Sequence, residues 1–256
     1  TINGMKKLYK DGKIRAIGIS NYSLSEIKNI IRYLKDVPLS SIQMEYNLYE
    51  RTIENNGILE FCENNYISLL AYSPLDQGQM FVISPNRRAV LSRIAKKYDK
   101  SIYQIILNFL INRNPVISIV RTTSKKHLLQ NIQSMSFKLL KEDVKLIQKT
   151  FPIEYYKIPI DKIMVSNSGE WDHKVYQTLD QAIQNKLGFT PSPKDLAKSI
   201  KKDNYLKPVR LIRSANPNNN YDFELVGGRI RYWAWVIAHG NNCPRIPAYI
   251  RKNYLK

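Results

Sequence analysis

The sequence predicts an α/β protein built from two modules in series. Up to residue 150, short apolar runs alternate with amphipathic helical patterns, which is typical of βα units around a parallel sheet. Pro152 interrupts this pattern, and a different succession of short strands and helices follows. A chain of 256 residues is long enough for two hydrophobic cores. We therefore expect one domain over residues 1–150 and a second over residues 156–256.

The first module contains four predicted βα units. Residues 14–20 are an apolar run typical of a buried parallel strand, and Ser23 and Glu26 have the spacing of a capping box at the start of a helix. Such alternation gives parallel strands joined by right-handed crossovers. The predicted strands are 14–20, 41–46, 67–72 and 116–120, and the predicted helices are 23–34, 56–64, 87–98, 101–112, 124–135 and 141–149.

Four segments of this module resemble the aldo-keto reductase family, in order and with that family's spacing. They are GKIRAIGISNYS at 12–23, QMEYNLYER at 43–51, AYSPLDQG at 71–78 and IVRTTSKKHLLQN at 119–131. The resemblance implies a partial (β/α)8 TIM barrel, namely its last four βα units, with the site at the carboxyl ends of the strands. It also implies an oxidoreductase that binds NADP, or NAD, and acts on a small-molecule substrate.

The resemblance assigns the nicotinamide end of the cofactor to these strand ends. Ser20, Asn21 and Gln43 match the residues that hold the carboxamide, and Tyr72, followed by Ser73, matches the one that stacks on the ring. An amide needs paired donors and acceptors, and a flat ring needs an aromatic surface. The alternative is that Ser20, Gln43 and Tyr72 are barrel-core residues without a ligand.

The adenosine end is assigned to the segment after the last strand. His127 stands where the family usually has an arginine, which weakens recognition of a 2′-phosphate, although Lys125 and Lys126 carry replacement charge. NADP is therefore favoured over NAD by a narrow margin. The resemblance assigns Arg121 and Thr122 to the 2′-phosphate, and Gln130 and Asn131 to the adenine.

The family's catalytic Asp, Tyr, Lys and His all belong to the first half of its barrel, and no residue of this sequence matches them. Hydride transfer to a carbonyl needs a proton donor, so we expect no reductase activity from this chain alone. The sequence opens at Thr1 without an initiator methionine, which we interpret as a fragment. The alternative is a half-barrel that stands alone, whose open sheet edges favour a homodimer.

The second module resembles a different family. Its predicted strands are 156–161, 209–213, 223–226 and 245–250, and its helices are 195–202 and 229–239. The segments LAKSIKKDNYLKPVRL at 196–211, FELVGGRIRYWAWVIAHG at 223–240 and IPAYIR at 246–251 resemble the ParB N-terminal domain, the sulfiredoxin-like proteins and the free serine kinases. The resemblance implies a small α+β domain that binds a nucleoside di- or triphosphate with Mg²⁺, and a kinase acting on a small hydroxyl compound.

A glycine turn in this module predicts a phosphate site. Gly227 and Gly228 separate a strand from a helix, so backbone amides and the helix N-terminus meet there beside two arginines. The alternative is a plain turn with surface arginines. The residues of the predicted nucleotide-phosphate site are Lys207, Pro208, Gly227, Gly228, Arg229 and Arg231.

Catalytic groups are harder to assign in this module. Gly227 and Ile230 occupy the places where kinase-like and sulfiredoxin-like relatives have Asp and His. Phosphoryl transfer needs a carboxylate, and Glu170, with Asp172 nearby, is the candidate in the insertion before the helix. An exposed loop carboxylate without a catalytic role is the alternative.

The net charge of +19 favours polyanionic partners. Residues 1–155 carry 23 basic and 13 acidic side chains, and residues 156–256 carry 17 and 8. Non-specific nucleic-acid binding is therefore the rival function, through Lys198, Lys201, Lys202, Arg210, Arg213, Arg229 and Arg231. A solvated lysine-rich surface is the alternative.

Two further features bound the class of protein. Cys62 and Cys243 match neither zinc-ligand nor CxxC spacing, so we predict ordinary thiols and no metal site. No apolar stretch approaches the ~20 residues of a membrane span, so we expect a soluble, cytoplasmic protein without a membrane partner.

Overall fold

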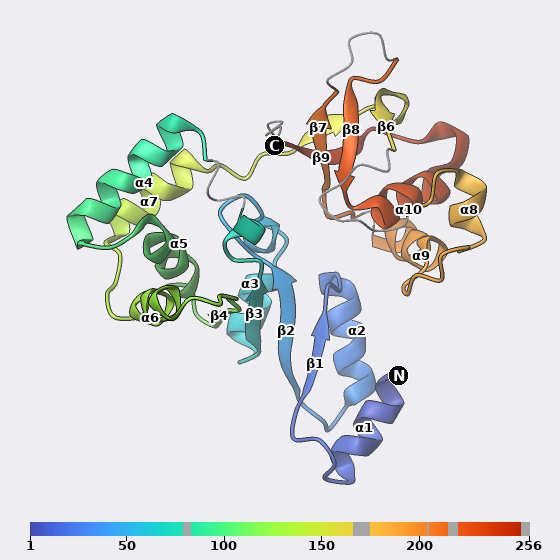
Figure 1. Cartoon of the computed structure of the whole chain (residues 1–256). Helices are drawn as coiled ribbons and strands as arrows, with labels where there is room; N and C mark the ends of the chain where they lie inside the picture. Colours follow the sequence, from blue (N-terminus) through green and yellow to red (C-terminus); the bar gives the residue numbers. More distant parts are fainter. Residues whose placement is uncertain (79–82, 166–174, 204, 215–219, 252–256) are drawn as a thin grey trace. The chain divides into compact units, whose positions relative to one another are not determined.

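The computed structural model describes residues 1–78, 83–165, 175–203, 205–214 and 220–251 (Figure 1). The chain divides into two compact units: unit 1, residues 1–153, and unit 2, residues 154–256. Each unit has a hydrophobic core of its own, and the two cores have no residue in common.

Unit 1 is a parallel sheet flanked by helices. The strand order is β1-β2-β3-β4, and every neighbouring pair is parallel, which confirms the predicted α/β fold with a parallel sheet. The strands are β1 (Ile17–Ser20), β2 (Leu39–Glu45), β3 (Ser68–Tyr72) and β4 (Val116–Ser118). The helices are α1 (Ile2–Lys10), α2 (Leu24–Leu34), α3 (Ile58–Asn64), α4 (Pro85–Tyr98), α5 (Ile102–Ile111), α6 (Lys125–Gln133) and α7 (Lys141–Thr150), with a 3₁₀ turn at Thr52–Glu54.

Local sequence signals explain where two of these helices begin. Ser23 and Glu26 form the predicted capping box of α2, and Ser101 and Gln104 form a second one at the start of α5. Every residue of α5 from Gln104 to Leu110 is buried, so this helix lies in the centre of unit 1. The strand predicted from residue 14 begins at Ile17, because Ile17 is the first residue that β2 pairs with. Helix α1 was not predicted, and it buries no side chain.

Unit 2 is a mixed sheet packed against helices. Its strand order is β5-β9-β7-β8-β6; β7 pairs parallel with β9 and antiparallel with β8. The strands are β5 (Tyr156–Ile158), β6 (Ile163–Met164), β7 (Val209–Arg213), β8 (Phe223–Gly227) and β9 (Ile246–Arg251), and the helices are α8 (Leu179–Ile183), α9 (Pro193–Asp203) and α10 (Arg229–His239). Neither β6 nor α8 was predicted, because elements of two and five residues are too short to show a periodic pattern.

The core of unit 2 is built on α10. Trp233 and Trp235 are buried, and their indole nitrogens donate to the carbonyl oxygens of Tyr176 and Pro244, both at 2.9 Å. A buried indole N–H needs such a partner. Both tryptophans are therefore core residues.

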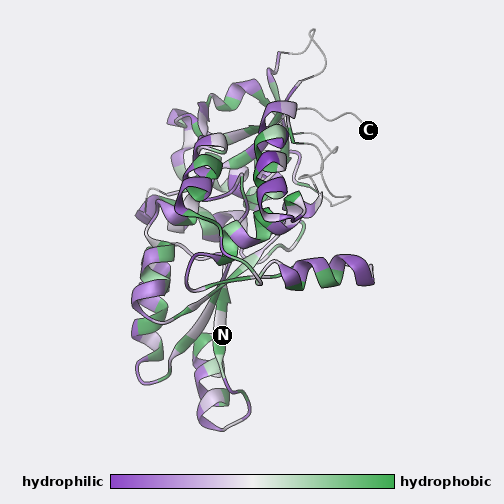
Figure 2. Ribbon diagram, turned by 90° about the vertical axis from the view of Figure 1, so that its left-hand side faces the viewer, coloured by the Kyte–Doolittle hydropathy of each residue, from purple (hydrophilic) through white to green (hydrophobic). Residues whose placement is uncertain are grey.

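Apolar residues gather in the two hydrophobic cores. Figure 2 shows apolar residues along the strands and alternating with polar residues along the helices. Within the described part of the chain, no helix is both long and apolar enough to cross a bilayer. Cys62 is buried, Cys243 is half-buried, and both are free thiols, as predicted.

Candidate functional site

Four of the predicted cofactor residues meet at the carboxyl edge of the unit 1 sheet. Ser20 ends β1 and is paired with Gln43 of β2, and Tyr72 ends β3. The Tyr72 hydroxyl donates to Asn21 Oδ1 at 3.0 Å, across 51 residues of sequence. Asn21 Nδ2 donates to Ser20 Oγ at 3.0 Å, and Asn21 N donates to the carbonyl oxygen of Gln43 at 3.0 Å. Parallel strands in sequence order bring these residues together.

The backbone turns sharply where β1 and β3 end. Asn21 has φ 61° and Ser73 has φ 51°, both in the left-handed region that non-glycine residues seldom adopt. Two hydrogen bonds hold Ser73 in this turn: its carbonyl oxygen accepts from Asn47 Nδ2 (3.3 Å), and its hydroxyl accepts from Gln77 Nε2 (3.2 Å). Such strained positions cluster at ligand sites. The turns leave Ser20 and Asn21 exposed and the ring of Tyr72 half-exposed at the edge of the sheet.

These side chains have the chemistry that a nicotinamide carboxamide needs. Asn21 and Gln43 each present an amide with a donor and an acceptor, and Ser20 adds a hydroxyl. Tyr72 offers an aromatic face that is held in place by its own hydroxyl. The residues present therefore fit the nicotinamide end of the cofactor.

The remaining predicted cofactor residues follow β4 along the same edge. Ser118 of β4 is paired with Ala71 of β3, and Ile119 N donates to the carbonyl oxygen of Ala71 at 2.8 Å. Thr122 Oγ1 accepts from Ser124 N at 3.1 Å, and Ser124 caps α6. Arg121, Lys125, Lys126 and His127 are exposed, whereas Thr122, Gln130 and Asn131 are half-buried.

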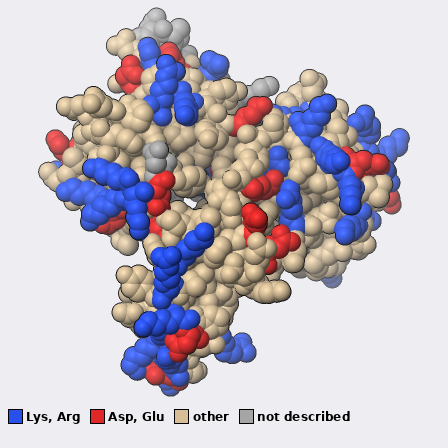
Figure 3. Space-filling view, turned by 180° about the vertical axis from the view of Figure 1, so that it is seen from behind, with Lys and Arg blue, Asp and Glu red and all other residues tan. Residues whose placement is uncertain are grey.

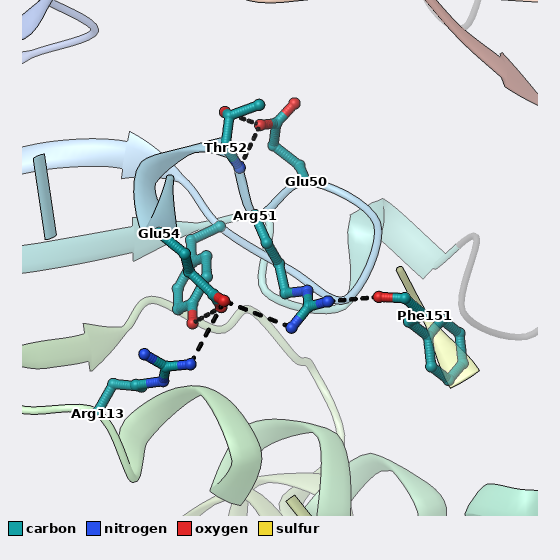
Figure 4. A network of polar contacts seen from close by, with 7 residues as sticks. Glu50, Arg51, Thr52, Glu54, Arg113 and Phe151 are labelled. Carbon is teal, nitrogen blue, oxygen red and sulfur yellow. Dashed lines mark hydrogen bonds and ion pairs between the residues drawn. The ribbon is translucent and has the colours of Figure 1, made fainter. Parts of the chain in front are cut away.

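A buried polar network is centred on Glu54, in the loop after β2, and the sequence did not predict it (Figure 4). Arg51, 3% exposed, donates to Glu54 Oε2 at 3.5 Å and to the carbonyl oxygen of Phe151. Arg113 Nη2 donates to the same Glu54 oxygen at 3.4 Å, and the Tyr46 hydroxyl donates to Glu54 Oε1 at 2.7 Å. The network ties the loop after β2 to the turn that follows α5 and to the end of α7. Its signal in the sequence was the group of three charged residues Glu50, Arg51 and Glu54.

The Tyr46 hydroxyl does not have the properties of a catalytic acid. Burial, then the charge of Glu54 and the hydrogen bond to it, raise the pKa of Tyr46 far above that of a free tyrosine. A proton donor works best when its pKa lies near the working pH. Tyr46 is therefore a structural hydroxyl that orients Glu54.

In unit 2 the predicted phosphate residues lie together at the start of α10. Gly228 has φ 85°, and a Cβ added to it would lie 2.9 Å from Arg231 Nη2, so another residue there would strain the backbone and displace the Arg231 side chain. Arg231 Nη1 donates to the carbonyl oxygens of Lys207 (2.8 Å) and Pro208 (2.7 Å). The structure therefore gives Arg231 a scaffolding contact that the sequence did not predict, joining α10 to the segment before β7.

The candidate carboxylates Glu170 and Asp172 lie outside the described residues. Among the residues that are described, no group of three or more His, Cys, Asp or Glu side chains is arranged to hold a metal ion. The described part of unit 2 thus contains the predicted phosphate-site residues Gly228 and Arg231 but no such group of potential metal ligands.

Comparison with known proteins matches unit 1 to one family. Residues 1–151 match the model of the aldo/keto reductase family. Glyoxal reductase of Bacillus subtilis (strain 168) is 32% identical over 144 residues, which are 56% of this chain and 49% of that protein.

Solved structures give the same match. A thermostable aldo-keto reductase crystallised with the inhibitor epalrestat is similar with a TM-score of 0.54 at 32% identity, over 58% of this chain and 53% of that one. An aldo-keto reductase complexed with NADPH gives 0.50 at 27% identity, over 57% of this chain and 45% of that one. The chain spans about half the length of these relatives. The match over residues 1–151, more than half of the sequence, shows that this chain belongs to the aldo/keto reductase family.

Proposed function

We propose that unit 1 is the cofactor-binding half of an NADP(H)-dependent reductase of small carbonyl compounds. The observation that carries the proposal is the cluster of Ser20, Asn21, Gln43 and Tyr72, in which the Tyr72 hydroxyl bonds Asn21 Oδ1 at 3.0 Å. The relative solved with NADPH supports the cofactor, and the glyoxal reductase of Bacillus subtilis supports small aldehydes as the substrate class. When bound, the cofactor supplies the hydride.

Each group of residues has its own part in this proposal. Ser20, Asn21 and Gln43 hold the carboxamide and so fix which face of the ring points toward the substrate. Tyr72 and Ser73 form the wall on the opposite face of the ring. Arg121 and Thr122 hold the 2′-phosphate, while Gln130 and Asn131 contact the adenine. The exposed positions of Arg121, Lys125 and Lys126 favour NADP over NAD, since an exposed cation is free to turn toward a phosphate.

The proton donor comes from outside the four βα units of this chain. The side chains of Ile117 and Ile119, on β4 and just after it, are 52% and 44% exposed, and α6 leaves Leu128, Leu129 and Ile132 about half exposed. An apolar edge of this kind calls for a covering element. We propose that further βα units close the barrel there and bring the catalytic acid; a second copy of the chain is the alternative, and sedimentation of the purified chain distinguishes the two.

Titration calorimetry with NADPH and NADH tests the cofactor proposal. Tyr72→Leu removes the aromatic wall and the contact to Asn21, so we expect NADPH affinity to fall about tenfold or more. Tyr66→Leu is the matched control, because Tyr66 is 96% exposed and precedes β3 at its amino end. Equal NADPH affinity in Tyr72→Leu and the parent chain would contradict the assignment, as would an absence of NADPH binding to the parent chain.

For unit 2 we propose a ParB-like domain over residues 156–256 that binds a nucleoside di- or triphosphate with Mg²⁺. In the kinase form of this proposal, Glu170 supplies the carboxylate that phosphoryl transfer needs. The support is the turn at Gly227 and Gly228, which opens an 11-residue helix with no side chain capping its first turn. Lys207, Pro208, Arg229 and Arg231 surround this turn in the proposal. In this proposal Arg229 and Lys207 meet the phosphates, and Arg231 also holds the carbonyl oxygens of Lys207 and Pro208.

Titration of the chain with ATP and CTP in the presence of Mg²⁺ tests this second proposal. Arg229→Gln should weaken nucleotide binding about tenfold, since charge-assisted bonds to phosphate are strong. Arg245→Gln, which changes an exposed arginine just before β9, is the matched control. An unchanged affinity in Arg229→Gln would sink the phosphate-site proposal.

Non-specific nucleic-acid binding is the rival proposal. It is supported by exposed Lys198, Lys201 and Lys202 on α9. On the face drawn in Figure 3, however, Lys and Arg side chains form separate groups with Asp and Glu among them. Binding to any duplex, with affinity that falls steeply as salt rises, would favour this rival; no binding at low salt would remove it.

A further inference from the structure

Helix α6 carries the two proposed adenine contacts, yet it buries none of its own side chains. Leu128, Leu129 and Ile132 on this helix are each about half exposed. Packing therefore contributes little to holding α6 on unit 1. Something other than its own apolar face must fix the position of the helix.

One buried side chain, that of Asn108, holds the residues just after α6 by hydrogen bonds. Asn108 of α5 is 3% exposed. Its Nδ2 donates to the carbonyl oxygens of Ser134 (2.8 Å) and Phe137 (2.7 Å), and its Oδ1 accepts from Leu139 N (3.2 Å). One carboxamide thus satisfies three backbone groups in six residues. Because both of its donors and its acceptor are used, the amide orientation is determined by these contacts.

This clamp is connected to the proposed cofactor residues through the backbone of α6. Ser134, which Asn108 holds, donates from its hydroxyl to the carbonyl oxygen of Asn131 (2.6 Å) and from its amide to that of Gln130 (3.1 Å). At the other end of the helix, Ser124 links α6 to Thr122. A displacement of residue 134 would therefore move Gln130 and Asn131 directly, and Thr122 with them.

We infer that Asn108 is a positioning residue for the adenosine end of the cofactor, acting through α6 without touching the ligand. The inference rests on the proposed NADP-binding function. It predicts that Asn108 matters for the adenosine phosphates and adenine but not for the nicotinamide, whose residues lie on β1, β2 and β3. Gln104 cannot replace the clamp, since its one contact to this region, Nε2 to Gln133 Oε1, is at the outer limit of 3.5 Å.

The test compares Asn108→Asp with Asn112→Asp. The first substitution keeps size and the acceptor oxygen but replaces the double donor by a carboxylate facing two carbonyl oxygens. The second introduces the same charge one turn later, at the exposed residue that follows α5. The probes are adenosine 2′,5′-bisphosphate for the adenosine end and reduced nicotinamide mononucleotide for the other. Asn108→Ser, which retains one donor, provides a second variant with a milder change.

We expect Asn108→Asp to weaken binding of adenosine 2′,5′-bisphosphate about tenfold or more and to change the affinity for reduced nicotinamide mononucleotide by less than about twofold. We also expect it to speed amide hydrogen exchange across residues 125–133. Asn112→Asp should leave both affinities and the exchange rate unchanged. The effects of Asn108→Ser should lie between those of the parent chain and those of Asn108→Asp. Equal losses for both probes would show a general structural role and overturn the inference, as would parent-like exchange in α6. If the parent chain binds neither probe, the proposed function itself fails, while exchange in α6 still reports whether Asn108 holds the helix.

Discussion

At the scale of single residues, the carboxylate of Glu54 is held by three other side chains. It accepts hydrogen bonds from Tyr46, Arg51 and Arg113, and the Glu54 side chain is 8% exposed. Arg51 is buried as well, at 3%. Removing one member of a buried ion pair costs more than the pair contributes, because the other charge is left without compensation. The Glu54 carboxylate is therefore needed to keep Arg51 inside the fold.

Glu54→Gln should lower the free energy of unfolding of unit 1 by about 3 kcal/mol, since Arg51 then remains buried without a counter-charge. Arg113→Gln should cost less than about 1 kcal/mol, because the Arg113 side chain is 36% exposed and water can replace its partner. Urea denaturation followed by circular dichroism measures both. Similar costs for the two substitutions would show that burial of the Arg51–Glu54 pair is not what matters.

At the scale of elements, α4 and α7 are joined by one carboxylate. Asp143 in the first turn of α7 accepts from Tyr98 Oη (2.6 Å) and Lys97 Nζ (2.9 Å), at the end of α4. Burial works to raise the pKa of Asp143, but the bonds from Tyr98 and Lys97 outweigh it and the pKa is lowered. A carboxylate whose pKa is lower in the folded state stabilises that state above its unfolded pKa of 3.8, and this contribution is lost as pH falls through the folded value.

Asp143→Asn should therefore destabilise unit 1 by about 2 kcal/mol at pH 7, as expected for hydrogen bonds to a charged group. The difference between variant and parent should stay constant from pH 7 down to about 5 and should shrink only as pH falls below the unfolded pKa of 3.8, because the parent then loses the same contribution by protonation. Chemical denaturation at a series of pH values gives the result. A difference that stays constant down to the lowest pH would mean that the charge of Asp143 is not the source of the stability.

At the scale of the whole molecule, the two units have separate cores, and this gives each of the above measurements an internal control. Trp171, Trp233 and Trp235 all belong to unit 2, so tryptophan fluorescence during denaturation reports on unit 2. Substitutions at Glu54 and Asp143 change unit 1, whose tyrosines contribute instead. Because the cores have no residue in common, the tryptophan transition should not move with either substitution.

Much of unit 1 could be predicted from its sequence because the signals are local. The capping box at Ser23 fixed the start of α2, and apolar runs located all four strands of the parallel sheet. The resemblance to the aldo-keto reductases named the candidate residues at the strand ends, and the parallel sheet places Ser20, Gln43 and Tyr72 on one edge. The hydrogen bond between Tyr72 and Asn21 could not, because it depends on how two side chains turn across β2.

Several of the contacts missed by the sequence join residues that are far apart in the chain. Arg51 reaches the carbonyl oxygen of Phe151 across 100 residues, and Asn108 reaches residues 134–139 from a helix that reads simply as apolar. Arg231 reads as a phosphate ligand, yet it bonds two backbone carbonyl oxygens. By itself the sequence determined the α/β class and the four strands of the parallel sheet, because these follow from periodicity and neighbouring residues, and its resemblance to the aldo-keto reductases named the candidate residues at the strand ends. Only the tertiary structure decided which polar side chains are clamps inside the fold and which remain at its surface, because a buried polar group must find its partners wherever the packed chain brings them.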